Sequence, residues 1–156
     1  MKNNPGSIKK IEVRIVREWS SEEIRHLYRM AGWWNEEWDP EGIRQVISGS
    51  LAFAVGIDQE TGGTVAMGRV ISDGVSDAYI QDVVVLEGYR SLGIGRRLLD
   101  ALVSACNIKG ISWIGLIAEP GTEQFYKPAG FTRMKGYTPM IFSGNGNNRD
   151  KNVIEK

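Results

Sequence analysis

The stretch from Val83 to Leu99 restricts the fold of this chain more than any other. It reads Val-Val-Val-Leu-Glu-Gly-Tyr-Arg-Ser-Leu-Gly-Ile-Gly-Arg-Arg-Leu-Leu, which predicts an apolar strand, a glycine-bearing loop and the start of an apolar helix. Gly93 and Gly95 remove β-carbons where a ligand must approach the backbone, and they permit unusual φ angles. The first turn of a helix attracts anions, because its N–H groups are unpaired and the helix dipole is positive there. The stretch therefore predicts a phosphate site at the start of the helix.

Three phosphate-binding patterns can be compared with this loop, around which Arg90, Arg96 and Arg97 add positive charge. The dinucleotide fingerprint requires a glycine at its sixth position, but counting from Gly93 that position is Leu98. A P-loop requires Gly-Lys-Ser/Thr after its glycines, and the chain has no such sequence. The pattern that fits is Arg-x-x-Gly-x-Gly, beginning at Arg90. Taken alone, these six residues are also compatible with a helix that merely begins with glycines.

The composition is that of an ordinary folded domain of 156 residues, with 42% hydrophobic and 24% charged side chains. The 19 basic and 19 acidic residues cancel, so the overall charge favours neither nucleic acid nor a membrane surface as a partner. Since Cys106 is the only cysteine and His26 the only histidine, an internal disulfide is excluded and we expect no metal site. No apolar run reaches the roughly 20 residues that span a bilayer, and residues 1–10 are polar, so we expect a cytoplasmic protein.

Apolar periodicity and turn residues predict a mixed fold around this stretch. Ser20 is an expected N-cap, and Glu23 would complete a capping box. The predicted elements are a strand at 10–17, helices at 20–30 and 39–49, strands at 51–57, 64–71 and 78–85, a helix at 93–107, a strand at 111–117, a short helix at 122–127 and one or two closing strands within 131–142. This order indicates an α/β or α+β sandwich around one mainly antiparallel sheet. We expect a single domain over residues 1–142 and a flexible polar tail at 143–156.

A second motif, Phe-Tyr-Lys-Pro-Ala-Gly-Phe from Phe125 to Phe131, follows another predicted strand. With both motifs in this order, the chain resembles the GNAT N-acetyltransferase superfamily. That superfamily has a pyrophosphate loop of the form Gln/Arg-x-x-Gly-x-Gly/Ala between its fourth strand and third helix, and a Phe-Tyr-x-x-x-Gly-Phe segment. The resemblance spans about Ile11 to Phe142 and is to single-domain members of bacterial or archaeal type. It implies a GNAT-like sandwich with a splayed, mainly antiparallel sheet flanked by helices.

The resemblance implies that acetyl-CoA is the acyl donor and that no metal takes part. Direct attack by an amine in a ternary complex needs positioning and a polarised thioester carbonyl. Backbone groups of the strand before the loop would contact the pantetheine arm and the carbonyl, and the loop would hold the phosphates. The corresponding positions are Val83, Val84 and Val85 in the strand, and Arg90, Ser91, Leu92, Gly93, Ile94, Gly95 and Arg96 in the loop.

Two residues are candidates for proton transfer. Tyr126 matches the family position at which a phenol protonates the departing thiolate, although it could instead be an aromatic side chain that packs a short helix. Asp82, on the strand before the loop, could take the amine's proton through water or anchor a cationic amine. Equally, Asp82 could pair with a buried arginine or a backbone amide for structural reasons.

Three positions depart from the family pattern. Ser91 replaces the usual glycine after the arginine, a mild change. Glu119 stands where the family often has an asparagine that touches the cofactor; since a carboxylate would repel phosphates, we expect Glu119 to face the acceptor amine. Pro128 lacks an N–H donor and should end or kink its helix early, which could shift the hydroxyl of Tyr126.

The acceptor side of the resemblance falls on residues 30–39, where Trp33, Trp34 and a third tryptophan are interleaved with acidic residues. These side chains could form an aromatic, acidic recess for a cationic amine, or the rings could plug the edge of the sheet while the acids stay solvated. We predict N-acetylation of the primary amine of a small molecule. The alternatives are a protein or peptide N-acetyltransferase and a non-catalytic acyl-CoA-binding regulatory module. A homodimer is compatible with the fold, because exposed sheet edges and terminal strands often pair.

Overall fold

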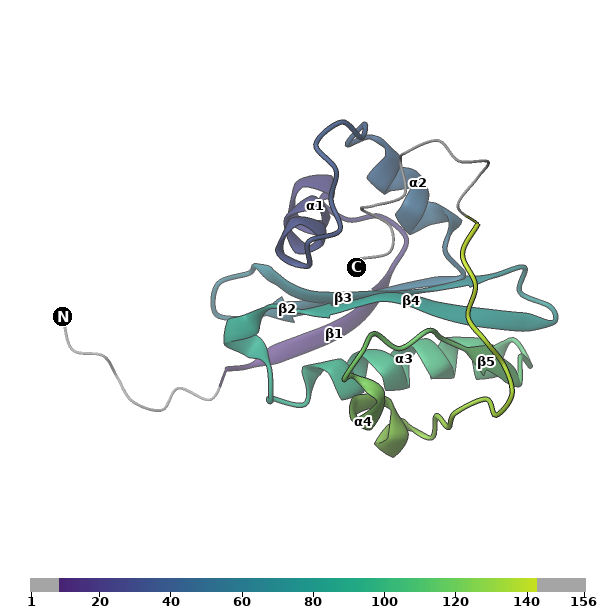
Figure 1. Ribbon diagram of the computed structural model, residues 1–156. Helices are drawn as coiled ribbons and strands as arrows, with labels where there is room; N and C mark the ends of the chain where they lie inside the picture. The colour runs from purple at the N-terminus through teal and green to yellow at the C-terminus, as the bar shows by residue number, and fades with distance from the viewer. Residues whose placement is uncertain (1–8, 143–156) are drawn as a thin grey trace. The chain divides into compact units, whose positions relative to one another are not determined.

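A computed structural model of the chain describes residues 9–142 (Figure 1). The chain divides into two compact units, Met1–Leu116 and Ile117–Lys156, which we call the first and the second unit and describe separately within residues 9–142. The single domain over residues 1–142 stays a prediction, and the tail at 143–156 lies outside the described residues. None of the helices formed by residues 9–142 has the length and apolarity required to cross a bilayer.

The first unit is built on a five-stranded sheet in the order β1-β2-β3-β4-β5. Neighbouring strands are antiparallel except β4 and β5, which are parallel. The strands are β1 (Ile11–Val16), β2 (Ala52–Asp58), β3 (Thr64–Ser72), β4 (Asp77–Val85) and β5 (Trp113–Gly115). The helices are α1 (Ser21–Met30), α2 (Gly42–Gly49), the 3-10 turn η1 (Glu87–Tyr89) and α3 (Ile94–Ile108). The predicted mixed fold around one mainly antiparallel sheet is confirmed.

The sheet separates two layers of helices, with α1 and α2 over one face and α3 over the other (Figure 1). The face toward α3 carries small residues: a β-carbon on Gly56 would lie 3.3 Å from Ile94 Cγ2, and one on Gly68 would lie 3.1 Å from Leu102 Cδ1. Glycine at these positions lets α3 approach the strands closely. The face toward α1 and α2 carries an apolar cluster of Val16, Ile24, Leu27, Ile43, Ile47, Phe53, Val55, Ile57 and Met67.

Helices α1 and α2 each begin with one contact that the sequence did not predict. The side chain of Ser20 caps α1 by accepting from the N–H of Glu23, as predicted. The carboxylate of Glu23 accepts from the N–H of Thr64 at 3.1 Å, so it joins α1 to β3 where a capping box was expected. Helix α2 begins at Gly42, after a turn in which the Asp39 carboxylate accepts from a backbone N–H.

The sheet opens between β4 and β5. Strand β5 has three residues, fewer than the predicted 111–117, and it pairs only with the segment Asp77–Tyr79 of β4. Strand β4 continues to Val85, so its edge beyond Tyr79 is not paired with β5. This is the splay that the resemblance predicted, and it exposes backbone groups at the end of β4 that leads to the loop.

The second unit, over residues 117–142, contains the short helix α4 (Glu123–Tyr126) and the 3-10 turn η2 (Lys127–Ala129). The α-helix ends at Tyr126, as Pro128 predicted. The prediction of closing strands within 131–142 is wrong, because these residues form no strand. Gly136 has a φ of 79°, and Pro139 has no N–H to donate, so a regular strand ladder is interrupted twice within a few residues.

Candidate functional site

The connection from β4 to α3 has the geometry of an anion site. Gly93 is the N-cap of α3 with a φ of 73°, in the left-handed region that favours glycine, and no side chain caps the helix. A β-carbon on Gly93 would meet no heavy atom of the described chain within 4 Å. Ile94 and Gly95 are buried, so only their backbone groups are placed to meet a ligand, whereas Leu92 is exposed. The first-turn N–H groups are therefore uncapped beside open space, as a phosphate would need.

Contacts from outside the loop hold its conformation. The Arg90 side chain donates from Nε to the Val85 carbonyl at 3.1 Å. The Tyr89 hydroxyl donates to Asp58 Oδ2 at 2.6 Å, which holds the pKa of the Asp58 carboxyl below its usual value. The Lys9 ammonium lies 3.8 Å from the centre of the Tyr89 ring. The approach to α3 is thus tied to the ends of β4 and β2 before any ligand binds.

The remaining loop side chains differ in what they contact. Arg97 donates to the Ile11 carbonyl at 2.9 Å and so joins α3 to β1, away from the loop. Arg96 is exposed and pairs with Asp100 at 2.8 Å on the next turn of α3. Ser91 has a φ of 62°, which explains why the family prefers glycine here: a left-handed conformation costs an L-residue roughly 1–2 kcal/mol.

Strand β4 contains a bulge directly before Val83. Gln81 pairs with Arg69 and Val84 with Met67, so two residues of β4 stand opposite Gly68 alone. The first of the two, Asp82, has a φ of 54°, in the left-handed region. A bulge removes one residue from the ladder and turns the strand locally. Val83, Val84 and Val85 therefore follow a bend at the point where β4 has no partner on the β5 side.

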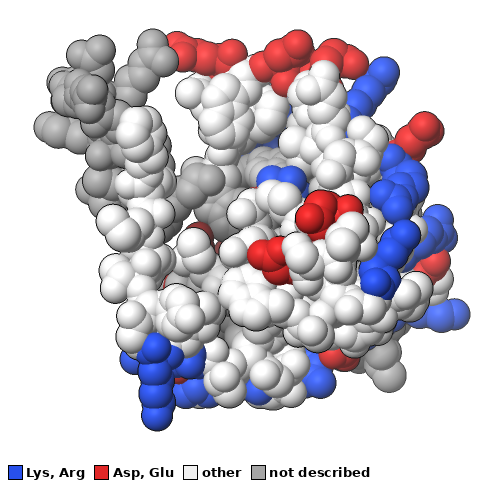
Figure 2. Space-filling model, turned by 90° about the vertical axis from the view of Figure 1, so that its right-hand side faces the viewer, with Lys and Arg blue, Asp and Glu red and all other residues white. Residues whose placement is uncertain are grey.

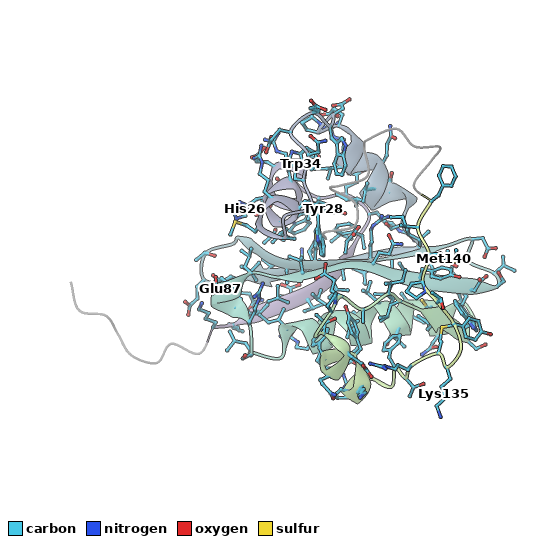
Figure 3. The ribbon with its side chains drawn as sticks, viewed as in Figure 1. His26, Tyr28, Trp34, Glu87, Lys135 and Met140 are labelled. Carbon is cyan, nitrogen blue, oxygen red and sulfur yellow. The ribbon has the colours of Figure 1, made fainter. Side chains whose placement is uncertain are left out.

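The Asp82 carboxylate is engaged by two side chains. Its Oδ2 accepts from Arg69 Nε at 2.6 Å and from the Tyr28 hydroxyl at 2.8 Å. Tyr28 extends from α1 toward the sheet (Figure 3), and burial together with the Asp82 charge raises the pKa of its hydroxyl. The structural alternative, a pairing of Asp82 with an arginine, is therefore present, and a base role for Asp82 stays a prediction.

Sequence reasoning missed Tyr28 and Arg69. The spacing of Tyr28 in its helix matches that of the apolar residues Ile24 and Leu27, so the sequence predicts no more than a packing role for it. Arg69 lies between buried positions of β3, and Asp82 is half-buried and precedes three valines in β4. An arginine and an aspartate at such positions of two neighbouring strands are the signal that could have predicted the pair, because buried charges need partners.

On the acceptor side, Trp33 and Trp34 are half-buried, whereas the neighbouring acidic side chains are exposed. Trp34 packs against the apolar cluster and meets Trp38 edge to face at 5.7 Å. The backbone N–H of Trp33 donates to the backbone carbonyl of Tyr28 near the end of α1. Glu36 accepts from Arg29 through both oxygens at 2.7 Å, so its charge is already paired. Acidic side chains gather on the surface over the α1–α2 connection (Figure 2, top), namely the exposed Glu36, Glu37, Asp39 and Glu41.

In the second unit, Tyr126 stands in an aromatic group. Its ring lies 4.9 Å from that of Phe125 and 6.1 Å from that of Phe131, centre to centre. Burial, and then the charge of Glu119, raise the pKa of the Tyr126 hydroxyl. Glu119 is exposed, and its carbonyl accepts from Thr122 directly before α4. The second unit thus links the two predicted residues electrostatically, while their parts in catalysis and acceptor binding stay predictions.

The single histidine and the single cysteine of the chain lie on helices of the first unit. His26 is exposed on the outer side of α1 (Figure 3). Cys106 is buried on the core face of α3, and burial raises the pKa of its thiol. Among residues 9–142, no three His, Cys, Asp or Glu side chains come together in a way that could hold a metal ion.

A family model described as an acetyltransferase (GNAT) domain matches residues 15–140. The chain is 38% identical over 85 residues to GCN5-related N-acetyltransferase 1, chloroplastic, of Arabidopsis thaliana, which is 54% of this chain and 43% of the relative. It is 43% identical over 70 residues to serotonin N-acetyltransferase 2, chloroplastic, of Oryza sativa subsp. japonica, covering 45% of this chain and 35% of the relative. The matches thus span less than half the length of either relative.

Solved structures agree with these matches. A GNAT-family acetyltransferase from Streptococcus pneumoniae TIGR4 superposes with a TM-score of 0.72 at 28% identity, covering 85% of this chain and 97% of the other. The family consists of acyltransferases that use acetyl-CoA. Its model spans the splayed sheet, the uncapped start of α3 and the aromatic group around Tyr126. The resemblance carried by the two motifs is therefore confirmed, and the chain belongs to the GNAT acetyltransferase family.

Proposed function

We propose that this protein transfers the acetyl group of acetyl-CoA to the primary amine of a small molecule, by direct attack in a ternary complex. The observation that carries the proposal is the β4–α3 connection. There, an unpaired strand edge leads into a left-handed glycine and an uncapped helix start. An extended thioester ligand with a pyrophosphate at its far end matches such an arrangement, because the strand edge can bind amide groups and the helix start can bind phosphates.

In this proposal the pyrophosphate is held by the N–H groups around Gly93, with Arg90 and Arg96 adding charge from the loop and the first turn of α3. The pantetheine amides pair with the edge of Val83–Val85 that β5 leaves unpaired, as an added strand would. A backbone N–H after the bulge donates a hydrogen bond to the thioester oxygen as negative charge develops there, which is where preorganised donors stabilise the transition state.

The ammonium form of the acceptor first gives a proton to water, and the free amine nitrogen then forms a bond to the thioester carbon while the carbon–sulfur bond breaks. Tyr126 gives its proton to the departing thiolate and regains one from water, and the nitrogen loses its second proton to water or to a carboxylate. Because burial and Glu119 raise the pKa of the Tyr126 hydroxyl, the phenol stays protonated at neutral pH and remains a proton donor.

The acceptor in this proposal is a cationic amine with an apolar or aromatic body. The exposed ring of Trp38 beside Trp34, together with the acidic surface over the α1–α2 connection, supports this class of acceptor. A relative from rice is named for an aromatic amine, serotonin. Trp33 and Glu119 are proposed to contribute to the acceptor site. A peptide or protein amine is the second candidate.

Acetyl-CoA with an amine panel tests the proposal, with thiol release followed over time. The panel contains serotonin, spermidine and a short peptide with a free N-terminus and one lysine. We expect acceptor-dependent thiol release with a small amine at a higher kcat/KM than with the peptide. The reverse order favours the protein acetyltransferase. Tight binding of acetyl-CoA with no acceptor-dependent release favours a regulatory module.

A pair of tryptophan variants locates the acceptor. W38A removes a ring that is 52% exposed, so we expect a higher KM for the amine, an unchanged KM for acetyl-CoA and little loss of stability. W34A removes a ring packed on the apolar cluster, so we expect a loss of stability of roughly 2–3 kcal/mol. An unchanged amine KM in W38A contradicts the proposed recess.

Two expectations from the sequence belong to the same proposal. A cytoplasmic location is proposed, although the two plant relatives carry the word chloroplastic in their names. Imaging of the tagged chain in its native cell tests the location. A homodimer is tested by light scattering across a range of protein concentrations.

A further inference from the structure

The left-handed conformation of Asp82 is unusual for a residue inside a strand. Among residues 9–142, only Asp82 and Ser91 combine a side chain with a positive φ, and Asp82 is the one within a β-ladder. L-residues are disfavoured in this region because the β-carbon crowds the carbonyl oxygen that follows it. Such a conformation persists only where the surroundings hold it in place.

Two elements hold Asp82 from the α1 side of the sheet. Arg69 reaches it from the neighbouring strand β3, and Tyr28 reaches it from α1, and both donate to Oδ2. The ion pair is shielded, with 18% of the Arg69 side chain and 19% of the Asp82 side chain exposed. Helix α1 is itself fixed, since Ile24 and Leu27 are fully buried beneath it. The network therefore has two rigid supports.

The opposite side of the bulge is also filled. A β-carbon on Gly68 would lie 3.3 Å from Val83 Cγ2 and 3.1 Å from Leu102 Cδ1. The side chain of Val83, directly after Asp82, therefore lies over Gly68 on the face of the sheet toward α3. Packing confines the bulge from the α3 side, and hydrogen bonds confine it from the α1 side. The direction in which β4 continues after the bulge therefore depends on both.

We propose that Tyr28, Arg69 and Asp82 form a positioning network that keeps the β4 bulge in its left-handed conformation. By doing so, the network aims the β4 backbone N–H groups at the thioester carbonyl of acetyl-CoA. This inference rests on the proposed function. Asp82 acts through the backbone that it shapes, since its Oδ2 accepts from both Arg69 and Tyr28 and is oriented by them.

Two substitutions of Asp82 distinguish this role from that of a base. Glycine adopts a left-handed conformation without a network, whereas alanine does not. We expect D82A to lower kcat with serotonin and acetyl-CoA by roughly 10- to 100-fold, since small misplacements at a reacting centre have effects of this size. We expect D82G to recover most of that loss, to within about threefold to fivefold of the wild type. A base at Asp82 predicts equal losses in the two variants and the loss of the acidic limb of the pH profile of kcat.

Y28F tests the network with the least disturbance of folding, because it removes only a hydroxyl. The readout is the carbonyl resonance of acetyl-CoA labelled with carbon-13 at that carbon and bound to the protein. A hydrogen bond to the carbonyl moves this resonance downfield, so we expect Y28F to move it back toward the position of the free ligand. The dissociation constant of CoA should change by less than about twofold, because the phosphate contacts are untouched. Y79F is the matched control, because it removes a hydroxyl from an exposed ring on β4, the strand that contains Asp82.

The outcomes separate the two proposals. Equal activity of D82G and D82A, wild-type activity of D82A, or an unmoved carbonyl resonance in Y28F would overturn the network. R69K should retain more activity than R69Q, because lysine keeps the charge beside Asp82. If the wild type binds acetyl-CoA but acetylates no amine in the panel, the proposed function fails, and the carbonyl resonance still tests the network. A wild type that binds no acetyl-CoA overturns both.

Discussion

The β4–α3 connection and the short helix around Tyr126 carry the two family motifs, but they use their residues differently. In the first, the ligand-facing groups belong to the backbone: Gly93 turns left-handed, the helix start is uncapped and the strand edge is free. In the second, a single phenol stands among aromatic rings. A backbone motif tolerates a changed side chain wherever the conformation survives, as at Ser91. A side-chain motif has no such latitude.

The largest effect is expected from Y126F, which removes the phenol hydroxyl of the second motif. We expect kcat to fall by about 100-fold, since a general acid contributes at least that much, while the dissociation constant of acetyl-CoA stays within about twofold. Steady-state kinetics and calorimetry measure the two quantities. The aromatic packing with Phe125 and Phe131 is preserved, so thermal unfolding should be nearly unchanged.

If Y126F keeps wild-type kcat, Tyr126 is an aromatic packing residue and the contrast between the motifs disappears. F131L is the companion variant, because it disturbs the same ring group without touching the phenol. We expect it to lower stability more than Y126F does and kcat less.

The backbone motif is tested by two glycines at opposite ends of α3. Gly93 and Gly110 have φ angles of 73° and 77°, and a β-carbon on either meets nothing within 4 Å. G93A and G110A should therefore lose similar stability, about 1 kcal/mol each. Only G93A places a methyl group where the phosphates are proposed to bind, so its affinity for acetyl-CoA should fall by roughly tenfold. Equal affinities in the two variants contradict a cofactor site at this end of the helix.

A smaller effect is expected in the pH profile. Burial and the negative charge of Glu119 both raise the pKa of the Tyr126 hydroxyl. E119Q removes the second cause, so the pKa should fall toward the ordinary tyrosine value. The alkaline limb of kcat, where the phenol loses its proton, should then move to lower pH. E123Q is the control, because Glu123 lies on α4 with Tyr126 and its carboxylate does not shift the pKa of Tyr126. The alkaline limb of E123Q should therefore stay at the wild-type pH.

The contrast also explains what the sequence could predict. The loop was predictable because its geometry is local: two glycines after a strand determine a left-handed turn and an uncapped helix. The bulge was not, because it depends on Tyr28 and Arg69, which are distant from Asp82 in the chain. The closing strands were wrong for a related reason. The apolar residues of 131–142 satisfy a strand pattern, but a strand forms only with a partner edge, and Gly136 and Pro139 interrupt the ladder.

The smallest effect is expected from S91G, and it tests the backbone motif most directly. Glycine relieves the strain of a φ of 62° at Ser91 but loses more conformational entropy on folding, so the net gain in stability should be about 0.5 kcal/mol. Affinity for acetyl-CoA should be unchanged, because the N–H of this residue is kept in the same place. S112G is the matched control, since Ser112 is an exposed loop residue without a positive φ, and it should lose stability by a similar amount. Urea denaturation measures both changes. A loss of acetyl-CoA affinity in S91G would mean that the serine hydroxyl binds the cofactor, and the first motif would then also depend on a side chain.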